Sequence, residues 1–128
     1  MAKILMPAMR REIDELEKLI EETRNSGILV IVEGKKDRIA LEKLGINNIV
    51  ELSKKPLFQI VEDVSSSNDE CAILTDLDRE GKGLFGKLNS QLQANGVRIN
   101  NKLREFLFRH TKLRQIKGIR TYIEGNKH

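Results

Sequence analysis

The chain has 128 residues and a formal net charge of +4, and its core has to be aliphatic because aromatic residues make up 4% of it and tryptophan is absent. A chain of this length can bury about two thirds of the surface that its unfolded form exposes, so it can fold without disulfides. A lone cysteine excludes an internal disulfide, and with two histidines the chain offers no cysteine and histidine cluster for zinc. Any metal that it binds should therefore have oxygen ligands.

Helices and strands alternate in the predicted secondary structure. Helical spacing of apolar residues, continuous apolar runs rich in β-branched residues, and glycine or asparagine stops define these elements. In chain order we predict an N-terminal helix within residues 1–26, a strand over 28–32, a helix over 37–44, a strand over 48–52, a helix over 57–64, a loop over 65–70, a strand over 71–75, a helix over 84–92, a short strand over 97–99 and a helix over 103–110. This alternation is typical of an open, mainly parallel α/β sheet flanked by helices, with right-handed crossovers.

The positive charge is concentrated near the C-terminus. From Arg98 onward nine lysine and arginine residues accompany two acidic residues, whereas the rest of the chain carries a small excess of acid. This distribution favours a polyanionic partner such as a nucleic acid. A solvated helix face that balances acidic neighbours is an alternative that charge alone leaves open.

A membrane location is not expected for this chain. The longest apolar run, residues 28–32, is far below the roughly 20 residues of a membrane span, and the N-terminus has no signal-peptide pattern. We therefore expect a cytoplasmic protein without membrane association.

Carboxylates follow two of the predicted strands. Glu33 directly follows the first strand, and Asp76 directly follows the third, with Asp78 and Glu80 at alternate positions beyond it. In open α/β sheets the ligand crevice lies beyond the carboxyl ends of the strands, where the strand order switches direction. If these two strands are neighbours there, Glu33 faces Asp76 and Asp78. Carboxylates packed this closely repel one another, so the pattern favours a hard divalent cation, and Mg²⁺ fits best.

Two structural alternatives apply to the same stretch. Asp76 could be a helix cap, with Asp78 and Glu80 as first-turn acids near a helix N-terminus. The stretch Gly81–Gly86 also satisfies the G-x-G-x-x-G pattern of dinucleotide-binding sites, but five residues separate it from the preceding strand. We interpret these glycines as allowing a tight start of the helix and close helix packing.

Two motifs in this chain together resemble those of Toprim domains. They are VIVEGKKD, Val30–Asp37, and TDLDREGKG, Thr75–Gly83. Toprim domains occur in type IA topoisomerases, bacterial-type primases, certain nucleases and ribosomal-RNA maturases. The resemblance covers residues 27–100 and implies a Toprim-type, mainly parallel four-stranded sheet. As a whole the chain is similar to small stand-alone Toprim proteins of archaea and some bacteria.

The resemblance also divides the chain into parts. We expect a single domain over residues 1–128, in which the Toprim core has an extra N-terminal helix over 1–26 and a basic C-terminal extension over 101–128. Its oligomeric state is left open.

By this resemblance, Glu33 matches a glutamate proposed as general acid or base, and Asp76 and Asp78 match a magnesium-binding pair. Glu80 matches a further acid of topoisomerase-like members. Glu33, Asp76 and Asp78 are therefore the candidate catalytic residues. The same three residues together with Glu80 are the candidate ligands of one or two Mg²⁺ ions, with Mn²⁺ as a substitute.

Basic residues beside the motifs are candidate contacts for substrate phosphate. These are Lys35, Lys36 and Arg79. The alternative is that both lysines are simply exposed and that Arg79 pairs with a local carboxylate. Asp37 also has the family's position, but it could simply cap the following helix.

The expected function is Mg²⁺-dependent phosphodiester chemistry on nucleic acid. The one tyrosine, Tyr122, is far from the motifs, and the chain has no room for the extra modules of a topoisomerase or a primase. A nuclease that acts on structured RNA or duplex nucleic acid, with RNA favoured over DNA, is the preferred interpretation. Few aromatic residues argue against extensive base stacking on single strands. The alternative is a noncatalytic metal-binding Toprim module that binds RNA or a larger nucleic-acid-processing complex.

Overall fold

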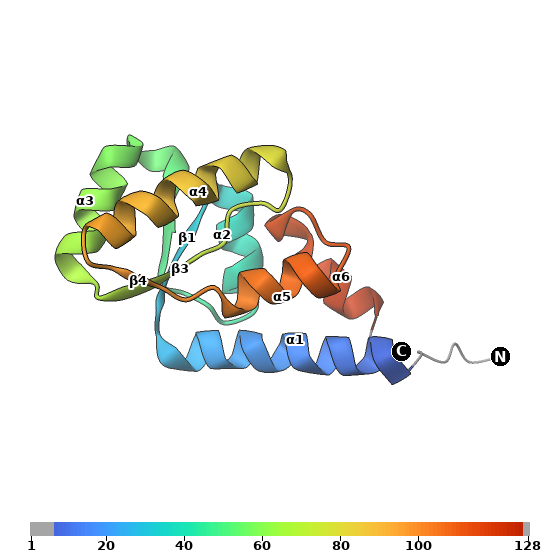
Figure 1. The fold of residues 1–128 in the computed structure, drawn as a ribbon. Coiled ribbons are helices and arrows are strands. Elements are labelled where there is room, and N and C mark those ends of the chain that lie inside the picture. Colours follow the sequence, from blue (N-terminus) through green and yellow to red (C-terminus); the bar gives the residue numbers. More distant parts are fainter. Residues whose placement is uncertain (1–6, 127–128) are drawn as a thin grey trace.

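A four-stranded parallel sheet lies at the centre of the protein, for which the computed structural model describes residues 7–126 (Figure 1). The strand order is β2-β1-β3-β4, and every neighbouring pair is parallel. The strands are β1 (Leu29–Val32), β2 (Ile49–Glu51), β3 (Glu70–Ile73) and β4 (Arg98–Ile99). The predicted α/β class, with an open parallel four-stranded sheet, is confirmed.

Helices cover both faces of this sheet. They are α1 (Pro7–Ser26), α2 (Lys35–Glu42), α3 (Leu57–Ser67), α4 (Arg79–Ala94), α5 (Lys102–His110) and α6 (Ile119–Gly125), with 3-10 turns over Leu52–Lys54 and Ile116–Gly118. One hydrophobic core joins α1, α2, α5 and α6 to one face, and a second joins α3 and α4 to the other. Alternate residues of β1 supply both cores: Val30 and Val32 belong to the first, Leu29 and Ile31 to the second. This explains why the strand is apolar at every position.

The strand order switches direction between β1 and β3. From β1 the chain passes through α2 to β2 on one side, and then through α3 to β3 on the other side of β1. Leu29 is aligned with Cys71, and Ile31 with Ile73. The carboxyl ends of β1 and β3 therefore lie side by side, which is the arrangement that places Glu33 near Asp76.

The loop predicted over residues 65–70 is confirmed only at residues 68 and 69 and is wrong at its two ends. Ser65–Ser67 complete α3, and Glu70 begins β3. The hydroxyls of Ser65 and Ser66 donate hydrogen bonds to the carbonyls of Glu62 and Asp63, three residues earlier, so the last turn of α3 satisfies both hydroxyls. The strand predicted over 71–75 ends at Ile73, although the Leu74 N–H still donates to the carbonyl of Ile31 at 2.8 Å.

Two further features complete the fold. The basic C-terminal extension, for which no element was predicted beyond residue 110, contains the second 3-10 turn and α6, whose buried Ile119 and Ile123 belong to the first core. Gly27 follows α1 with φ +68°, a left-handed conformation that glycine adopts without strain. None of the helices within residues 7–126 has the length and apolar character needed to cross a membrane.

Candidate metal and catalytic site

Glu33 and Asp76 meet at the switch point of the sheet. Glu33 directly follows β1, and Asp76 lies three residues beyond the end of β3. One carboxylate oxygen of Glu33, Oε2, accepts a hydrogen bond from the Asp76 N–H at 2.7 Å. Two residues that are 43 positions apart are thus joined directly across the crevice, as the sequence pattern predicts.

The C-terminal part of the chain holds the Asp76 loop in place. The Ile116 N–H donates to Asp76 Oδ1 at 2.8 Å, and the Leu77 N–H donates to the carbonyl of Arg114 at 2.7 Å. The guanidinium of Arg104 donates to the carbonyls of Thr75 and Asp76, the latter at 3.1 Å. The backbone between β3 and α4 is therefore fixed from both α5 and the segment that follows it.

Asp78 is the helix cap in this loop, a role that the sequence analysis offered for Asp76 as an alternative to metal binding. It is the N-cap of α4, and its Oδ1 accepts a hydrogen bond from the Gly81 N–H at 2.8 Å. The predicted cap is thus present, but it is Asp78 and not Asp76. Glu80 lies exposed in the first turn of α4 and forms no hydrogen bond or ion pair within the described chain.

Four carboxylates at this site accept backbone hydrogen bonds, and Asp37 is the fourth, after Glu33, Asp76 and Asp78. Its Oδ2 accepts a hydrogen bond from the Gly34 N–H at 3.1 Å, so it caps the start of α2, and its side chain is buried. Burial raises the pKa of Asp37, and the charge of Asp76 raises it further, whereas Lys117 lowers it. The negative charge of Asp76, in the loop after β3, therefore acts electrostatically on Asp37 at the start of α2.

The electrostatics of the site favour a proton on Glu33. Burial is the main cause that raises the pKa of this carboxyl, and the charges of Asp76, Asp37 and Asp78 add to it. The hydrogen bond from the Asp76 N–H opposes the shift. Glu33 consequently holds a proton at higher pH than an ordinary glutamate does.

Arg104 is the cation of this site, and the sequence analysis did not assign it a role. It is buried, and burial lowers its pKa while the charges of Glu33 and Asp76 raise it. The signal in the sequence is its position between Leu103 and Leu107 on the apolar face of a helix, where a charged residue needs partners. Lys117, which lowers the pKa of Asp37, was also not predicted as a site residue.

The donor set fits a metal ion that keeps most of its own water. Glu33, Asp76 and Asp78 each use one oxygen for a backbone N–H, and their second oxygens accept no hydrogen bond from the described residues. Within residues 7–126, no group of three or more acidic, histidine or cysteine side chains is arranged to hold a metal ion. Mg²⁺ is commonly bound through one or two carboxylates, with waters and substrate phosphates as the other ligands. The arrangement therefore suits an open magnesium site but not a closed cage.

A family model for the Toprim domain matches residues 27–101, which contain all four carboxylates. The chain belongs to the Toprim family. The resemblance inferred from the two motifs is thereby confirmed, with a boundary that differs by one residue. Toprim domains typically bind divalent metal ions and are associated with work on nucleic acids.

Similar proteins come mainly from archaea. A UPF0292 protein of Methanosarcina barkeri is 34% identical over 122 residues, which cover 89% of this chain and 84% of that protein. A UPF0292 protein of Thermococcus onnurineus is 40% identical over 104 residues, covering 80% and 77% respectively. A solved structure of a protein from Aquifex aeolicus has a TM-score of 0.68 at 29% identity, covering 84% of this chain and 94% of that one.

We refer to Glu33, Asp37, Asp76 and Asp78 together as the Toprim site. The predicted phosphate contacts lie on the surface at the starts of α2 and α4. Lys35 and Lys36 are exposed in the first turn of α2, and Arg79 is exposed at the start of α4. None of the three forms an ion pair within the part of the chain that the structure describes. Arg79 does not pair with a local carboxylate there, so all three side chains are available to a ligand.

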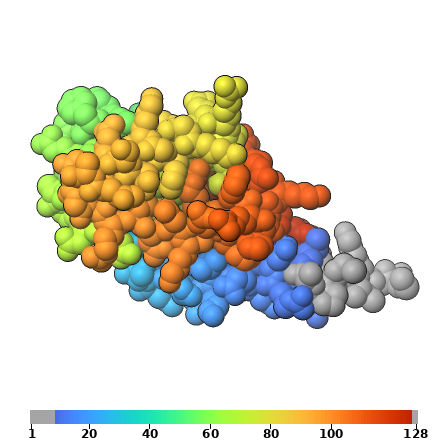
Figure 2. All heavy atoms as spheres, viewed as in Figure 1, coloured from blue at the N-terminus to red at the C-terminus, as the bar shows by residue number. Residues whose placement is uncertain are grey.

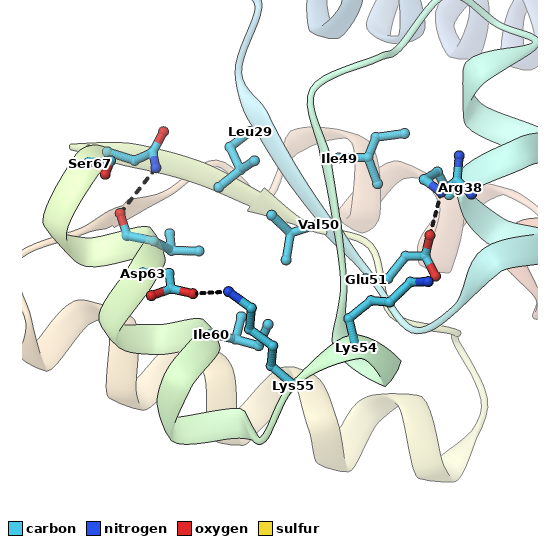
Figure 3. Close-up of a pocket in the computed structure, with 12 residues that line it drawn as sticks. Leu29, Arg38, Ile49, Val50, Glu51, Lys54, Lys55, Ile60, Asp63 and Ser67 are labelled. Atoms are coloured by element: carbon cyan, nitrogen blue, oxygen red, sulfur yellow. Dashed lines mark hydrogen bonds and ion pairs between the residues drawn. The ribbon is translucent and has the colours of Figure 1, made fainter.

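A separate pocket of about 640 Å³ lies beside the edge strand β2 (Figure 3). Lys55 pairs with Asp63 at 2.7 Å on its rim, and Arg38 pairs with Glu51. These charges are neutralised within the chain, and none of the four carboxylates lines this pocket. We therefore do not include it in the candidate site.

Proposed function

We propose that the protein is a Mg²⁺-dependent nuclease that hydrolyses phosphodiester bonds at the Toprim site. One observation carries the proposal: Glu33, with a raised pKa, is hydrogen bonded to the backbone of Asp76 across the switch point. A carboxyl whose pKa is raised is a stronger base than an ordinary glutamate and is suited to accept and return a proton.

The metal ligands that we propose are Asp76 and Asp78, with Glu33 nearby and Glu80 as a further ligand from the first turn of α4. When bound, Mg²⁺ would neutralise the nonbridging phosphate oxygens and orient the attacking water. Asp76 is held by the Ile116 N–H and Asp78 by the Gly81 N–H. These bonds fix one oxygen of each carboxylate and leave the other for the ion.

Glu33 is the proposed acid and base. In hydrolysis the water oxygen forms a bond to phosphorus, one phosphorus–oxygen ester bond breaks, and the departing oxygen takes up a proton. Glu33 Oε1, the oxygen that does not accept the Asp76 N–H, would take the proton of the attacking water and return it to solvent, and the departing oxygen would take its proton from solvent water. Lys35, Lys36 and Arg79 would contact the flanking phosphates.

The substrate that we propose is structured RNA, with duplex DNA as the less favoured choice. The excess of lysine and arginine from Arg98 onward supports a polyanion, and the C-terminal segment that carries it packs directly against the Asp76 loop. The partner that we propose is a larger RNA-processing complex.

A noncatalytic Toprim module is the second candidate, and a specific observation favours it. Three of the four carboxylates accept backbone hydrogen bonds at helix starts or between strand ends, and the fourth accepts one from the C-terminal segment. The carboxylates could therefore be retained for structure alone. In that case the protein would bind RNA without cutting it.

Cleavage assays with matched variants separate these candidates. Structured RNA and duplex DNA are incubated with Mg²⁺ or with EDTA, using wild type, Glu33→Gln, Asp76→Asn and Glu80→Gln. The amides of Glu33→Gln and Asp76→Asn keep an oxygen that accepts the native backbone hydrogen bond, and the Glu80 side chain is exposed, so the fold should survive in all three variants, as circular dichroism can verify. Glu62→Gln, an exposed change on α3, is the control.

For the nuclease, cleavage should require Mg²⁺, and Glu33→Gln should slow it by about 100-fold or more, as general acid and base residues typically contribute. Asp76→Asn should also abolish the stabilisation of the fold by Mg²⁺, measured as the rise in Tm. Salt-sensitive RNA binding without cleavage by any form would support the noncatalytic module instead.

A further inference from the structure

A small pocket lies between the start of α4 and one side of α5, the helices that face the viewer in Figure 2. Its volume is about 230 Å³. The residues that line it are Leu77, Lys82, Phe85, Arg104, Glu105 and Phe108, and we refer to it as the aromatic pocket. Two of the four phenylalanines of the chain are therefore in one place.

The aromatic pocket adjoins the loop that carries Asp76 and Asp78. Leu77, which lies between Asp76 and Asp78 in the sequence, is one of its lining residues. Arg104 also lines the pocket, and its guanidinium donates to the carbonyl of Asp76 at 3.1 Å. The same loop and the same arginine thus form part of both features.

Cations are placed over both rings of the aromatic pocket. Arg104 Cζ lies 4.5 Å from the centroid of Phe85, and Lys82 Nζ lies 4.5 Å from the centroid of Phe108. The guanidinium of Arg114 lies 5.8 Å from the same Phe108 ring. Phe108 is nevertheless 43% exposed, so a large part of its apolar surface is accessible to a ligand.

This combination suits one nucleobase with its phosphate nearby. Aromatic faces and arginine planes stack bases, and lysine and arginine attract the backbone. The volume is below the 300–1,000 Å³ or so of pockets for drug-sized ligands, which favours a single ring system. Glu105 repels phosphate, but it pairs with Arg109 at 3.0 Å and can accept a hydrogen bond from a base N–H.

We propose that the aromatic pocket binds one unpaired base of the nucleic acid, next to the phosphate at the Toprim site. The substrate would then contain a loop, a bulge or a single-stranded end at the site of action, because a base in a continuous duplex cannot leave the stack without cost. This inference rests on the proposed function. It also modifies the expectation drawn from the low aromatic content: aromatic residues are few, but two of them line a pocket beside the loop that carries Asp76 and Asp78.

A binding experiment in EDTA tests the pocket separately from cleavage. The probes are an RNA hairpin with one bulged 2-aminopurine and a fully paired RNA of equal length. The variant is Phe108→Leu, and the matched control is Phe58→Leu, which changes a phenylalanine on α3 that is 67% exposed and outside the pocket. Both side chains are on the surface, so neither change should unfold the protein.

We expect wild type and Phe58→Leu to quench the 2-aminopurine fluorescence and to bind the bulged RNA about 10-fold more tightly than the paired RNA. Phe108→Leu should lose most of the quenching and of this preference. Equal behaviour of Phe108→Leu and Phe58→Leu, or equal binding of the two RNAs by wild type, would overturn the inference. Selective binding without Mg²⁺-dependent cleavage would instead refute only the nuclease proposal.

Discussion

Replacing Gly81 by alanine should disrupt the loop that carries the candidate site. A Cβ at this position would lie 2.5 Å from the carbonyl carbon of Asp76 and 2.8 Å from its Cα, with the carbonyl oxygen nearer still. Gly81 is also bonded through its backbone to both ends of the loop: its N–H donates to Asp78, and its carbonyl accepts from the Thr75 hydroxyl at 2.7 Å. The clash is with backbone, so a change of side-chain rotamer cannot relieve it.

The magnitude follows from the distances. Real Cβ contacts essentially never fall below 3.0 Å, and the carbonyl oxygen is the nearest atom, so α4 and the Asp76 peptide would have to separate by about 1 Å. Overpacking of this kind costs about 1–3 kcal/mol, partly offset by the higher helix propensity of alanine. Gly83→Ala is the matched control two residues along the same helix, because a Cβ there meets nothing within 4 Å. It should stabilise the protein by about 0.5–1 kcal/mol.

Urea unfolding and thermal denaturation of both variants provide the assay. The alanine propensity gain is common to both variants, so the free energies of unfolding of Gly81→Ala and Gly83→Ala should differ by the overpacking cost of about 1–3 kcal/mol, which corresponds to roughly 5–10 °C in Tm for a domain of this size. Gly81→Ala should also lose the stabilisation by Mg²⁺ expected for the proposed metal site. If the two variants unfold at the same urea concentration, the close contact between α4 and the Asp76 peptide is refuted.

Three other outcomes test the packing and charges of the fold. Burial raises the pKa of the Cys71 thiol to about 11, so iodoacetamide at pH 8 should label it slowly in the native protein and rapidly in urea; fast native labelling would contradict its burial. Leu107→Ala should lower the free energy of unfolding by about 2–5 kcal/mol, whereas Phe58→Ala should change it by less than about 0.5 kcal/mol, and equal effects would argue against the first core. Lys55 holds the pKa of Asp63 below its usual 3.8, so the stability difference between wild type and Asp63→Asn should be present above pH 3.8 and should disappear as the pH falls through the folded-state pKa; a difference that does not vary with pH in urea unfolding would contradict this pairing.

The sequence predicted the parts of the fold that depend on periodicity and strand order. A continuous apolar run between two glycines located β1, and the short stretch over 48–52 located β2, each within a residue or two. The acidic residues after two strands indicated the switch point. Serine has a weak helix propensity, so the end of α3 at Ser67 could not be distinguished from a loop. The hydrogen bonds of Ser65 and Ser66 to the preceding turn become visible only in the structure.

The chemical types of the site residues could be predicted, but their second roles could not. A DLDRE stretch is compatible with both a metal site and a helix cap, and Asp78 is a cap in the structure. Arg104 could not be assigned because its partners are backbone carbonyls 28 and 29 residues away, which leave no pattern in the sequence. The contact between Ile116 and Asp76 likewise depends on tertiary packing alone.

The hydrogen bond from Ile116 to Asp76 has a consequence for how such a domain can be shuffled in evolution or trimmed for expression. The match to the Toprim family ends at residue 101, yet the loop with both aspartates is tied to Arg104, Arg114 and Ile116. A fragment cut at residue 101 would keep every motif residue and lose these tethers. The smallest transferable unit is therefore longer than the stretch that matches the Toprim family, and a fusion protein has to include the C-terminal segment as well.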